Sequence, residues 1–279
     1  MQIKLAGERT LSTTRNSFVM GILNATPDSF YSESRKPDLN AGLDSARMMI
    51  DEGADIIDIG GESTRPGSAY VEAAEEIKRV VPLIEGIRKF SDIAVSIDTR
   101  KADVAEAAIK AGADIVNDVS GLRDDARLGF VVSQHDVPVI LMHMRGTPEN
   151  MQRNPHYTYA VEEIINELEI CISRAKSLQI PSEKIIIDPG IGFGKRLEDN
   201  LSILKNIHRF RNLGYMLLIG LSRKSFIGSV TGADVDSRLA GSLAANMYAA
   251  AGGAEILRVH DVKETVWMLD MLAAIEGAG

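Results

Sequence analysis

The stretch AVSIDTRKADVAEAAIKAGADIVND, residues 94–118, holds the pattern that decides the fold. It begins and ends with short apolar runs, Ala94 to Asp98 and Ile115 to Asp118, and each run closes on a polar residue, as strands buried on both faces often do. Between them, Lys101 to Ala111 carries apolar residues at helical spacing, and Gly112 stands where a glycine commonly ends a helix. The stretch therefore predicts a strand, a helix and a second strand parallel to the first.

The same unit recurs along the chain. Eight apolar runs of this kind are Phe18 to Asn24, Ile56 to Gly60, Ala94 to Asp98, Ile115 to Asp118, Pro138 to His143, Ile185 to Asp188, Met216 to Ser222 and Glu255 to His260. Helix-like segments between them include Leu39 to Glu52, Val71 to Phe90, Val161 to Leu178 and Ser237 to Ala251. We predict an α/β fold, a TIM-type (β/α)8 barrel in one domain over residues 1–279. A short strand pair within residues 2–15 is expected to cap its lower end.

An open doubly wound sheet is the alternative architecture. Such a sheet usually has fewer strands, and its glycine fingerprint follows the first strand. Here the first strand runs into NATPDSF, residues 24–30, which contains no glycine. The barrel is therefore the preferred prediction.

Composition narrows the class of protein. A chain of 279 residues with 45% apolar content can bury a sizeable core, and its formal charge of −8 argues against a nucleic-acid partner. Cys171 is the single cysteine, so it can form neither an internal disulfide nor a thiolate-rich metal site, and we expect it to be a buried helix residue. Neither a signal peptide nor a membrane span is visible, which predicts a soluble, cytoplasmic protein with no membrane partner.

Polar residues stand at the ends of nearly all the predicted strands. In barrel enzymes the chemistry is carried at these ends and in the loops that follow them. A single aspartate in such a place often only caps the next helix, but the repetition across so many strands predicts a site at the barrel's mouth. The residues concerned are Asn24, Asp58, Asp98, Asn117 with Asp118, His143, Asp188, Lys224, and Arg258 with His260.

The residue types indicate what such a site can bind. Carboxylates gathered at one mouth share protons, bind a cation or accept hydrogen bonds from ligand N–H groups. Phe193 in DPGIGFGK offers an aromatic face to a planar ring, and the cations Arg65, Lys224 and Arg258 could clamp a pyrophosphate group. Asn24 offers an oxygen ligand for Mg²⁺, whereas the scattered histidines show no zinc spacing.

The chain resembles the dihydropteroate synthase family over almost its whole length. The segments that carry the resemblance are MGILNATPDSF (20–30), GGESTRPG (60–67), SIDTRK (96–101), NDVSG (117–121), LMHMRG (141–146), DPGIGFGK (188–195), GLSRKSFIG (220–228) and RVHDV (258–262). The resemblance implies a transferase that joins 6-hydroxymethyl-7,8-dihydropterin pyrophosphate to p-aminobenzoate, with Mg²⁺, in folate biosynthesis. It also implies a homodimer.

The resemblance also assigns roles to single residues. It implies a catalytic set of Asp98, Asp188, Lys224, Arg258 and His260. It implies that Asp98, Asn117 and Asp188 hold the pterin ring, that Lys224 contacts the ring's carbonyl and N5 side, and that Met142 and Phe193 flank it. Asn24, Arg258 and His260 would hold the pyrophosphate and its magnesium, with Val259 among the substrate contacts. Thr64, Arg65 and Pro66 would close with Pro27 to Phe30 over p-aminobenzoate, near Lys224 and Ser225.

One segment departs from the family, and three other functions remain open. Where many members follow TPDSF with Ser, Asp and two glycines, this chain reads YSESRKP from Tyr31 to Pro37, which leaves the p-aminobenzoate side less defined. The alternatives are a methyltetrahydrofolate-dependent corrinoid methyltransferase, a pterin-binding paralogue without catalysis, and an aldolase that uses Lys224 as a Schiff-base amine. The pyrophosphate-binding set around Lys224 and Arg258 favours the synthase.

Overall fold

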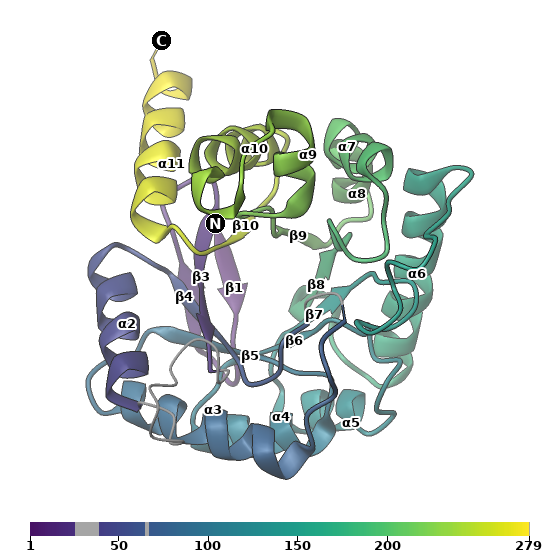
Figure 1. Ribbon diagram of the computed structural model, residues 1–279. Coiled ribbons are helices and arrows are strands. Elements are labelled where there is room, and N and C mark those ends of the chain that lie inside the picture. The colour runs from purple at the N-terminus through teal and green to yellow at the C-terminus, as the bar shows by residue number, and fades with distance from the viewer. Residues whose placement is uncertain (26–38, 65–66, 279) are drawn as a thin grey trace.

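The computed structural model describes residues 1–25, 39–64 and 67–278 (Figure 1). Within this part of the chain, eight parallel strands form a closed barrel in the order β10-β3-β4-β5-β6-β7-β8-β9. The strands are β3 (Phe18–Asn24), β4 (Ile56–Gly60), β5 (Ala94–Asp98), β6 (Ile115–Asp118), β7 (Val139–Met142), β8 (Ile185–Asp188), β9 (Met216–Ile219) and β10 (Ile256–Val259). Closure through β10, which pairs with both β9 and β3, confirms the barrel and excludes the open sheet.

Helices surround the barrel on all sides (Figure 1). Among the described residues these are α2 (Leu39–Asp51), α3 (Ala73–Arg88), α4 (Ala102–Ala111), α5 (Leu128–His135), α6 (Ala160–Ser177), α7 (Leu197–Lys205), α8 (Ile207–Arg211), α9 (Ser225–Thr231), α10 (Leu239–Ala251) and α11 (Val262–Glu276), with short 3-10 turns η1 (Ser182–Lys184) and η2 (Val235–Ser237). None of these helices combines the length and the apolar character needed to cross a bilayer.

Left-handed glycines end helices where the chain turns back toward the barrel. Gly112 takes φ +115° after α4 and donates its N–H to the Ile109 carbonyl. Gly53 and Gly253 adopt the same conformation before β4 and β10. Side chains with a Cβ rarely adopt this conformation, so these glycines explain why α2, α4 and α10 stop just before the next strand.

Two apolar layers hold the barrel together. The larger lies between the strands and the helices, and it includes Cys171 on α6, which is 5% exposed, as predicted for a packing residue. The smaller fills the lower half of the barrel, with Phe18, Met20 and Ile140 among its members. These residues interdigitate in the barrel interior as alternate side chains of each strand turn inward.

The N-terminal strand pair closes the floor of the barrel. Strand β1 (Gln2–Lys4) pairs antiparallel with β2 (Thr10–Ser12), which confirms the predicted extension. Ile3 and Leu5 are 2% and 3% exposed and pack against the inner apolar cluster. The lower end of the barrel is therefore sealed by apolar side chains, and the polar strand ends lie at the opposite mouth.

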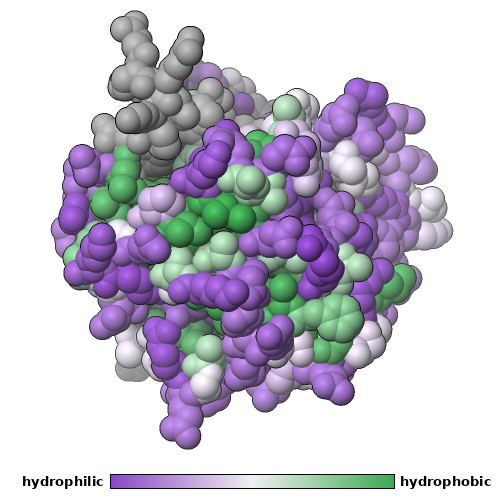
Figure 2. Space-filling view, turned by 90° about the horizontal axis from the view of Figure 1, so that it is seen from below, coloured by the Kyte–Doolittle hydropathy of each residue, from purple (hydrophilic) through white to green (hydrophobic). Residues whose placement is uncertain are grey.

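One outer face of the molecule is mostly polar. Figure 2 shows the molecule from below the view of Figure 1, and hydrophilic side chains cover most of that face, with hydrophobic ones gathered in smaller patches. This is the distribution expected for amphipathic helices that bury only their inner stripe.

Candidate active site

Four polar side chains from different strands meet in the upper half of the barrel. Arg258 on β10 donates from Nε to Asp58 Oδ2 at 2.6 Å and from Nη2 to Asp98 Oδ2 at 2.7 Å. Asn117 on β6 donates to the same Asp58 oxygen at 3.2 Å. Because β3 separates β10 from β4, the arginine bridges strands that do not pair directly. The structure thus brings together four of the residues predicted at the mouth, joined through Arg258 and Asp58.

Burial of the cluster favours a proton on Asp98, whereas its main charged neighbour, Arg258, favours the carboxylate. Burial raises the pKa of Asp98 to about 7, with Arg258 opposing the shift and Asp58 adding to it. For Arg258, burial opposes the charge, but Asp58 and Asp98 raise its pKa above the usual range. The cluster therefore holds a permanent cation beside a carboxyl group that titrates near neutral pH, an arrangement typical of functional sites.

Asp188 ends β8 and begins a tight turn. Its Oδ1 accepts a hydrogen bond of 2.7 Å from the Gly190 N–H. Gly190 has φ +67°, and a Cβ there would lie 1.9 Å from the His143 carbonyl oxygen, so only glycine fits. Burial raises the pKa of Asp188, and Lys224 and the Gly190 hydrogen bond oppose that shift. The carboxylate is therefore held in one orientation within the field of a nearby cation.

Lys224 precedes α9 and extends toward the loop after β8. Its Nζ lies 4.6 Å from the centre of the Phe193 ring and donates to the Ile191 carbonyl. Burial lowers the pKa of Lys224 to about 8, while Asp188 favours the charged form. The lysine and the aromatic ring thus form one recognition unit, a cation over a π face.

Methionines form the apolar wall beside this unit. Met142, at the end of β7, packs in a buried cluster with Val119, Met144 and Met151, and Phe193 packs against it half-buried. Thioether side chains adapt to an aromatic ring, so the wall can accept a flat heterocycle. The two residues predicted to flank the ring, Met142 and Phe193, are therefore neighbours.

The remaining predicted residues lie around the mouth. Asn24 is the half-buried last residue of β3, and Thr64 is half-buried in the loop after β4. Ser225 is the exposed first residue of α9. His260 follows β10, and its N–H and Nδ1 lie 3.2 and 3.1 Å from Ser222 Oγ. Arg65 and Pro66, the segment Pro27 to Phe30, and the unusual segment Tyr31 to Pro37 lie outside the described residues.

Two strand-end residues point out of the barrel interior. The Val259 side chain is fully buried in the layer between the strands and the helices, so its predicted substrate contact would be made by the Val259 backbone. The cause is strand alternation, which turns Arg258 inward and its neighbour outward. Asp118 is likewise fully buried and accepts hydrogen bonds from the Ser120 and Leu122 N–H groups, a turn-capping role.

Comparison with known proteins decides the family. The sequence pattern described as "pterin binding enzyme" matches residues 20–260. Dihydropteroate synthase from Clostridium beijerinckii is 44% identical over 259 residues, which cover 92% of this chain and 94% of that protein. The chain belongs to the dihydropteroate synthase family.

Solved structures of family members share the whole fold. The Xanthomonas albilineans dihydropteroate synthase solved with 4-aminobenzoic acid superposes with a TM-score of 0.93 at 40% identity, covering 100% of both chains. The same enzyme in complex with 7,8-dihydropteroate gives a TM-score of 0.89 at 38% identity, again covering 100% of both chains. The family resemblance predicted from the motifs is thereby confirmed.

Sequence reasoning missed a buried charge network beside the mouth of this family member. Lys101 Nζ donates to Glu62 Oε2 at 2.6 Å and also to Glu76 on α3. Arg100 Nη2 donates to Glu62 Oε1 at 2.7 Å, and Tyr70 lies against both cations. The network ties the loop after β4 to the end of β5, and the only signal in the sequence was the position of Glu62 and Lys101 inside two family motifs.

A second missed network lies behind Phe193. Lys195, 4% exposed, contacts His143, which in turn contacts Glu167 on α6. His143 had been singled out only as a strand-end residue. Its two partners could not be deduced without the fold, because they come from two segments far from His143 in the sequence.

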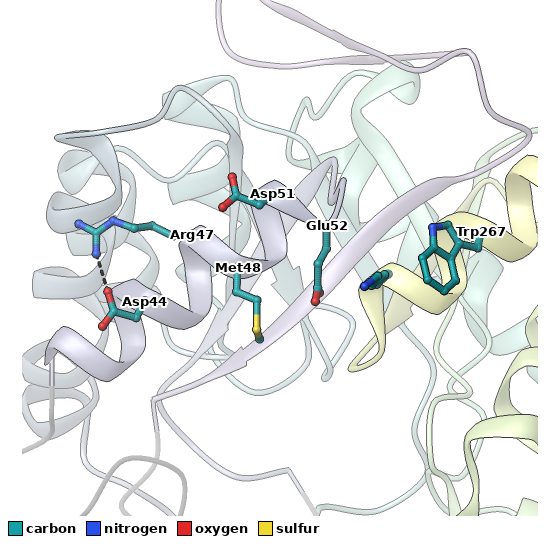
Figure 3. Close-up of a pocket in the computed structure, with 7 residues that line it drawn as sticks. Asp44, Arg47, Met48, Asp51, Glu52 and Trp267 are labelled. Atoms are coloured by element: carbon teal, nitrogen blue, oxygen red, sulfur yellow. Dashed lines mark hydrogen bonds and ion pairs between the residues drawn. The ribbon is translucent and has the colours of Figure 1, made fainter.

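A groove on the outer surface lies away from these residues. It runs between α2 and α11 and is lined by Asp44, Arg47, Met48, Asp51, Glu52, Lys263 and Trp267 (Figure 3). Arg47 pairs with Asp44 of its own helix at 2.7 Å. None of the predicted site residues that the structure describes lines it.

Proposed function

We propose that the chain catalyses the condensation of 6-hydroxymethyl-7,8-dihydropterin pyrophosphate with p-aminobenzoate, which yields 7,8-dihydropteroate and pyrophosphate. The observation that carries the proposal is the placement of Asp188 at the barrel mouth, close enough to Lys224 to favour its charge, together with the contact between Lys224 and the Phe193 ring. Support comes from the Xanthomonas albilineans relative, whose structures hold 4-aminobenzoic acid and 7,8-dihydropteroate.

Asp188, Asn117 and Asp98 would hold the pterin ring. The ring presents N3–H and a 2-amino group side by side, and one carboxylate can accept both hydrogen bonds. Asp188 has the fixed orientation that such a bidentate contact needs, since the Gly190 N–H anchors it. Met142 and Phe193 would flank the ring faces, with Lys224 at its carbonyl and N5 side.

The reaction needs no nucleophile from the protein. Electron donation from the dihydropterin ring expels pyrophosphate as the exocyclic C–O bond breaks, and the bonding pair leaves with the oxygen. The amine of p-aminobenzoate then forms the C–N bond and loses a proton. Asp98 and Asp188 would stabilise the positive charge that develops on the ring, and Arg258 and His260 would stabilise the leaving group.

Magnesium is proposed as a cofactor that works with the substrate. Among the described residues, no cluster of three or more His, Cys, Asp or Glu side chains is placed to hold a metal ion. Asn24 supplies one neutral oxygen at the mouth, and Mg²⁺ commonly uses few protein ligands together with substrate phosphates and water. When bound, the ion would neutralise charge on the departing pyrophosphate.

Assembly and location are proposed from separate features. Met247 and Tyr248 on α10, and Met271 and Ile275 on the neighbouring α11, are exposed large apolar residues, which supports a homodimer that sedimentation velocity can measure. The lone buried Cys171 suits the reducing cytoplasm, and cell fractionation tests that location.

The decisive experiment follows pyrophosphate release from the pterin substrate, with and without p-aminobenzoate and Mg²⁺. Wild type should form dihydropteroate, and Asp188→Ala and Lys224→Ala should each lower kcat/KM by about 10²- to 10³-fold, the usual loss for one electrostatic contact to a transition state. Val230→Ala, which changes an exposed residue on α9, serves as the control and should keep wild-type activity.

Other outcomes would point to the alternatives. Pterin binding without dihydropteroate would contradict the synthase and favour the paralogue or the corrinoid methyltransferase. Borohydride trapping of Lys224 on a carbonyl substrate would favour the aldolase.

A further inference from the structure

Lys195 is buried beside the backbone of Phe193. Its side chain is 4% exposed, and its Nζ lies 2.9 Å from the Phe193 carbonyl oxygen, 3.3 Å from the His143 carbonyl oxygen and 3.0 Å from His143 Nδ1. Burial lowers the pKa of Lys195 well below its usual range, and Asp188 opposes that shift. In the ammonium form its three N–H groups match these three acceptors, and a buried lysine whose donors are all used acts as a fixed three-way tether.

His143 is held in the orientation that Lys195 needs. Its Nε2 lies 2.9 Å from Glu167 Oε2, and the other oxygen of Glu167 accepts from Arg145 Nε at 2.8 Å. Burial and the Lys195 charge lower the pKa of His143 to about 3, so its ring is neutral. Burial alone would raise the pKa of Glu167, but the hydrogen bonds from His143 and Arg145 lower it to about 2. The neutral ring therefore donates from Nε2 to the carboxylate and presents the Nδ1 lone pair to Lys195.

The same histidine joins the loops that follow β7 and β8. The backbone N–H of His143 donates to the Asp188 carbonyl at 2.8 Å. A Cβ at position 190 would lie 1.9 Å from the His143 carbonyl oxygen, so the close contact between the two loops requires Gly190. Phe193 N–H in turn donates to the Gly190 carbonyl at 3.1 Å. A displacement of Lys195 would thus be transmitted to the Phe193 peptide and to the turn that begins at Asp188.

We propose that Lys195, oriented by His143 and Glu167, is a positioning residue of the pterin site that holds the Phe193 ring beneath Lys224. It touches neither substrate in this arrangement and acts through the backbone carbonyl of Phe193. The inference rests on the proposed function, because it assigns the Phe193 face to the pterin ring.

The test compares two buried lysines at opposite ends of β8. Lys195→Met removes the tether above the strand, with little change in side-chain length. Lys184→Met is the matched control, since Lys184 is 6% exposed below the same strand and donates to the Asp136 carbonyl at 2.6 Å. Both variants should lose stability, so stability alone does not distinguish them.

The readout is equilibrium binding of 6-hydroxymethylpterin, which has no leaving group, measured by calorimetry on folded protein. Lys195→Met should weaken binding about 10- to 100-fold, the range for losing a charged hydrogen bond that orders a site, and Lys184→Met should bind as wild type does. In turnover, Lys195→Met should raise KM for the pterin pyrophosphate more than KM for p-aminobenzoate.

A double-mutant cycle with Phe193→Ala tests the route of action. If Lys195 works through Phe193, its substitution should have little further effect once the ring is gone, so the two changes should be strongly non-additive. Additive losses, or wild-type pterin affinity in Lys195→Met, would overturn the proposal. Either result leaves the proposed function standing as long as wild type forms dihydropteroate.

Glu167→Gln provides a second route if Lys195→Met does not fold. Position 167 is 31% exposed, so the protein should tolerate the change. The amide has one oxygen, which cannot accept from both His143 and Arg145, and the hold on His143 should loosen. A loss of about two- to fivefold in pterin affinity is expected for such a weakened contact, and unchanged affinity would contradict the chain of contacts.

Discussion

At the scale of single residues, the protonation of Lys224 is expected to make the activity depend on pH. Burial lowers its pKa to about 8, so the free protein carries the cation below that pH and loses it above. If the cation binds the substrate, kcat/KM should fall as the pH rises beyond 8. Lys224→Arg keeps the charge and should move this fall beyond pH 10, even if kcat/KM is lower throughout. A pH–rate profile of each protein measures where kcat/KM falls. If Lys224→Arg shows the same fall near pH 8, the fall belongs to the titration of another group.

At this scale, sequence reasoning found polar residues but not their partners. Asp98, Asn117 and Arg258 were predicted from their places after apolar runs, because a barrel gathers such places at one mouth. Their contacts through Asp58 depend on the hydrogen bond from Arg258 on β10 to Asp58 on β4. No residue spacing in the sequence predicts that contact. Lys195 and Glu62 escaped notice because charged loop residues are normally solvated, and only the folded chain reveals that these two are buried.

At the scale of elements, the network around Lys101 joins the loop after β4, the end of β5 and helix α3. Lys101→Met would leave the carboxylates of Glu62 and Glu76, 8% and 0% exposed, without their shared cation. The loss should lower the free energy of unfolding by about 3–5 kcal/mol, as for other broken buried ion pairs. Urea denaturation measures it, with the surface variant Lys78→Met on α3 as control. A loss in Lys101→Met no larger than that of the control would show that the network adds no stability.

The ends of the barrel strands could be predicted from the sequence where the whole apolar run lies within the strand. Five strands begin and end as their apolar runs do, because both faces are covered. The other three are shorter than their runs, and the extra residues, such as His143 and Leu221, continue into the mouth as buried loop. An apolar run in the sequence indicates which residues are buried. At the barrel mouth, residues remain buried beyond the last hydrogen bond between strands, so the run is longer than the strand.

At the scale of the whole molecule, stability and chemistry lie at opposite ends of the barrel. Leu5 is 3% exposed and helps to close the floor, far along the strands from Asp188 and Lys224. Leu5→Ala should lower the free energy of unfolding by about 2–5 kcal/mol, the range for a buried leucine, and leave pterin affinity unchanged. Denaturation and calorimetry on the same preparation test the separation, and a pterin affinity that falls with stability would show that the two ends are coupled.

Closure of the barrel also affects whether copies of this chain can associate through their sheet edges. The backbone of each of the eight strands is hydrogen-bonded to two neighbouring strands. The main sheet therefore has no exposed edge to which a strand of another molecule could be added. In the described part of the chain, open margins belong to β1 and β2, and each spans only three residues. Such short edges are poor templates for intermolecular sheets, so the native fold is protected against edge-to-edge aggregation by its own topology.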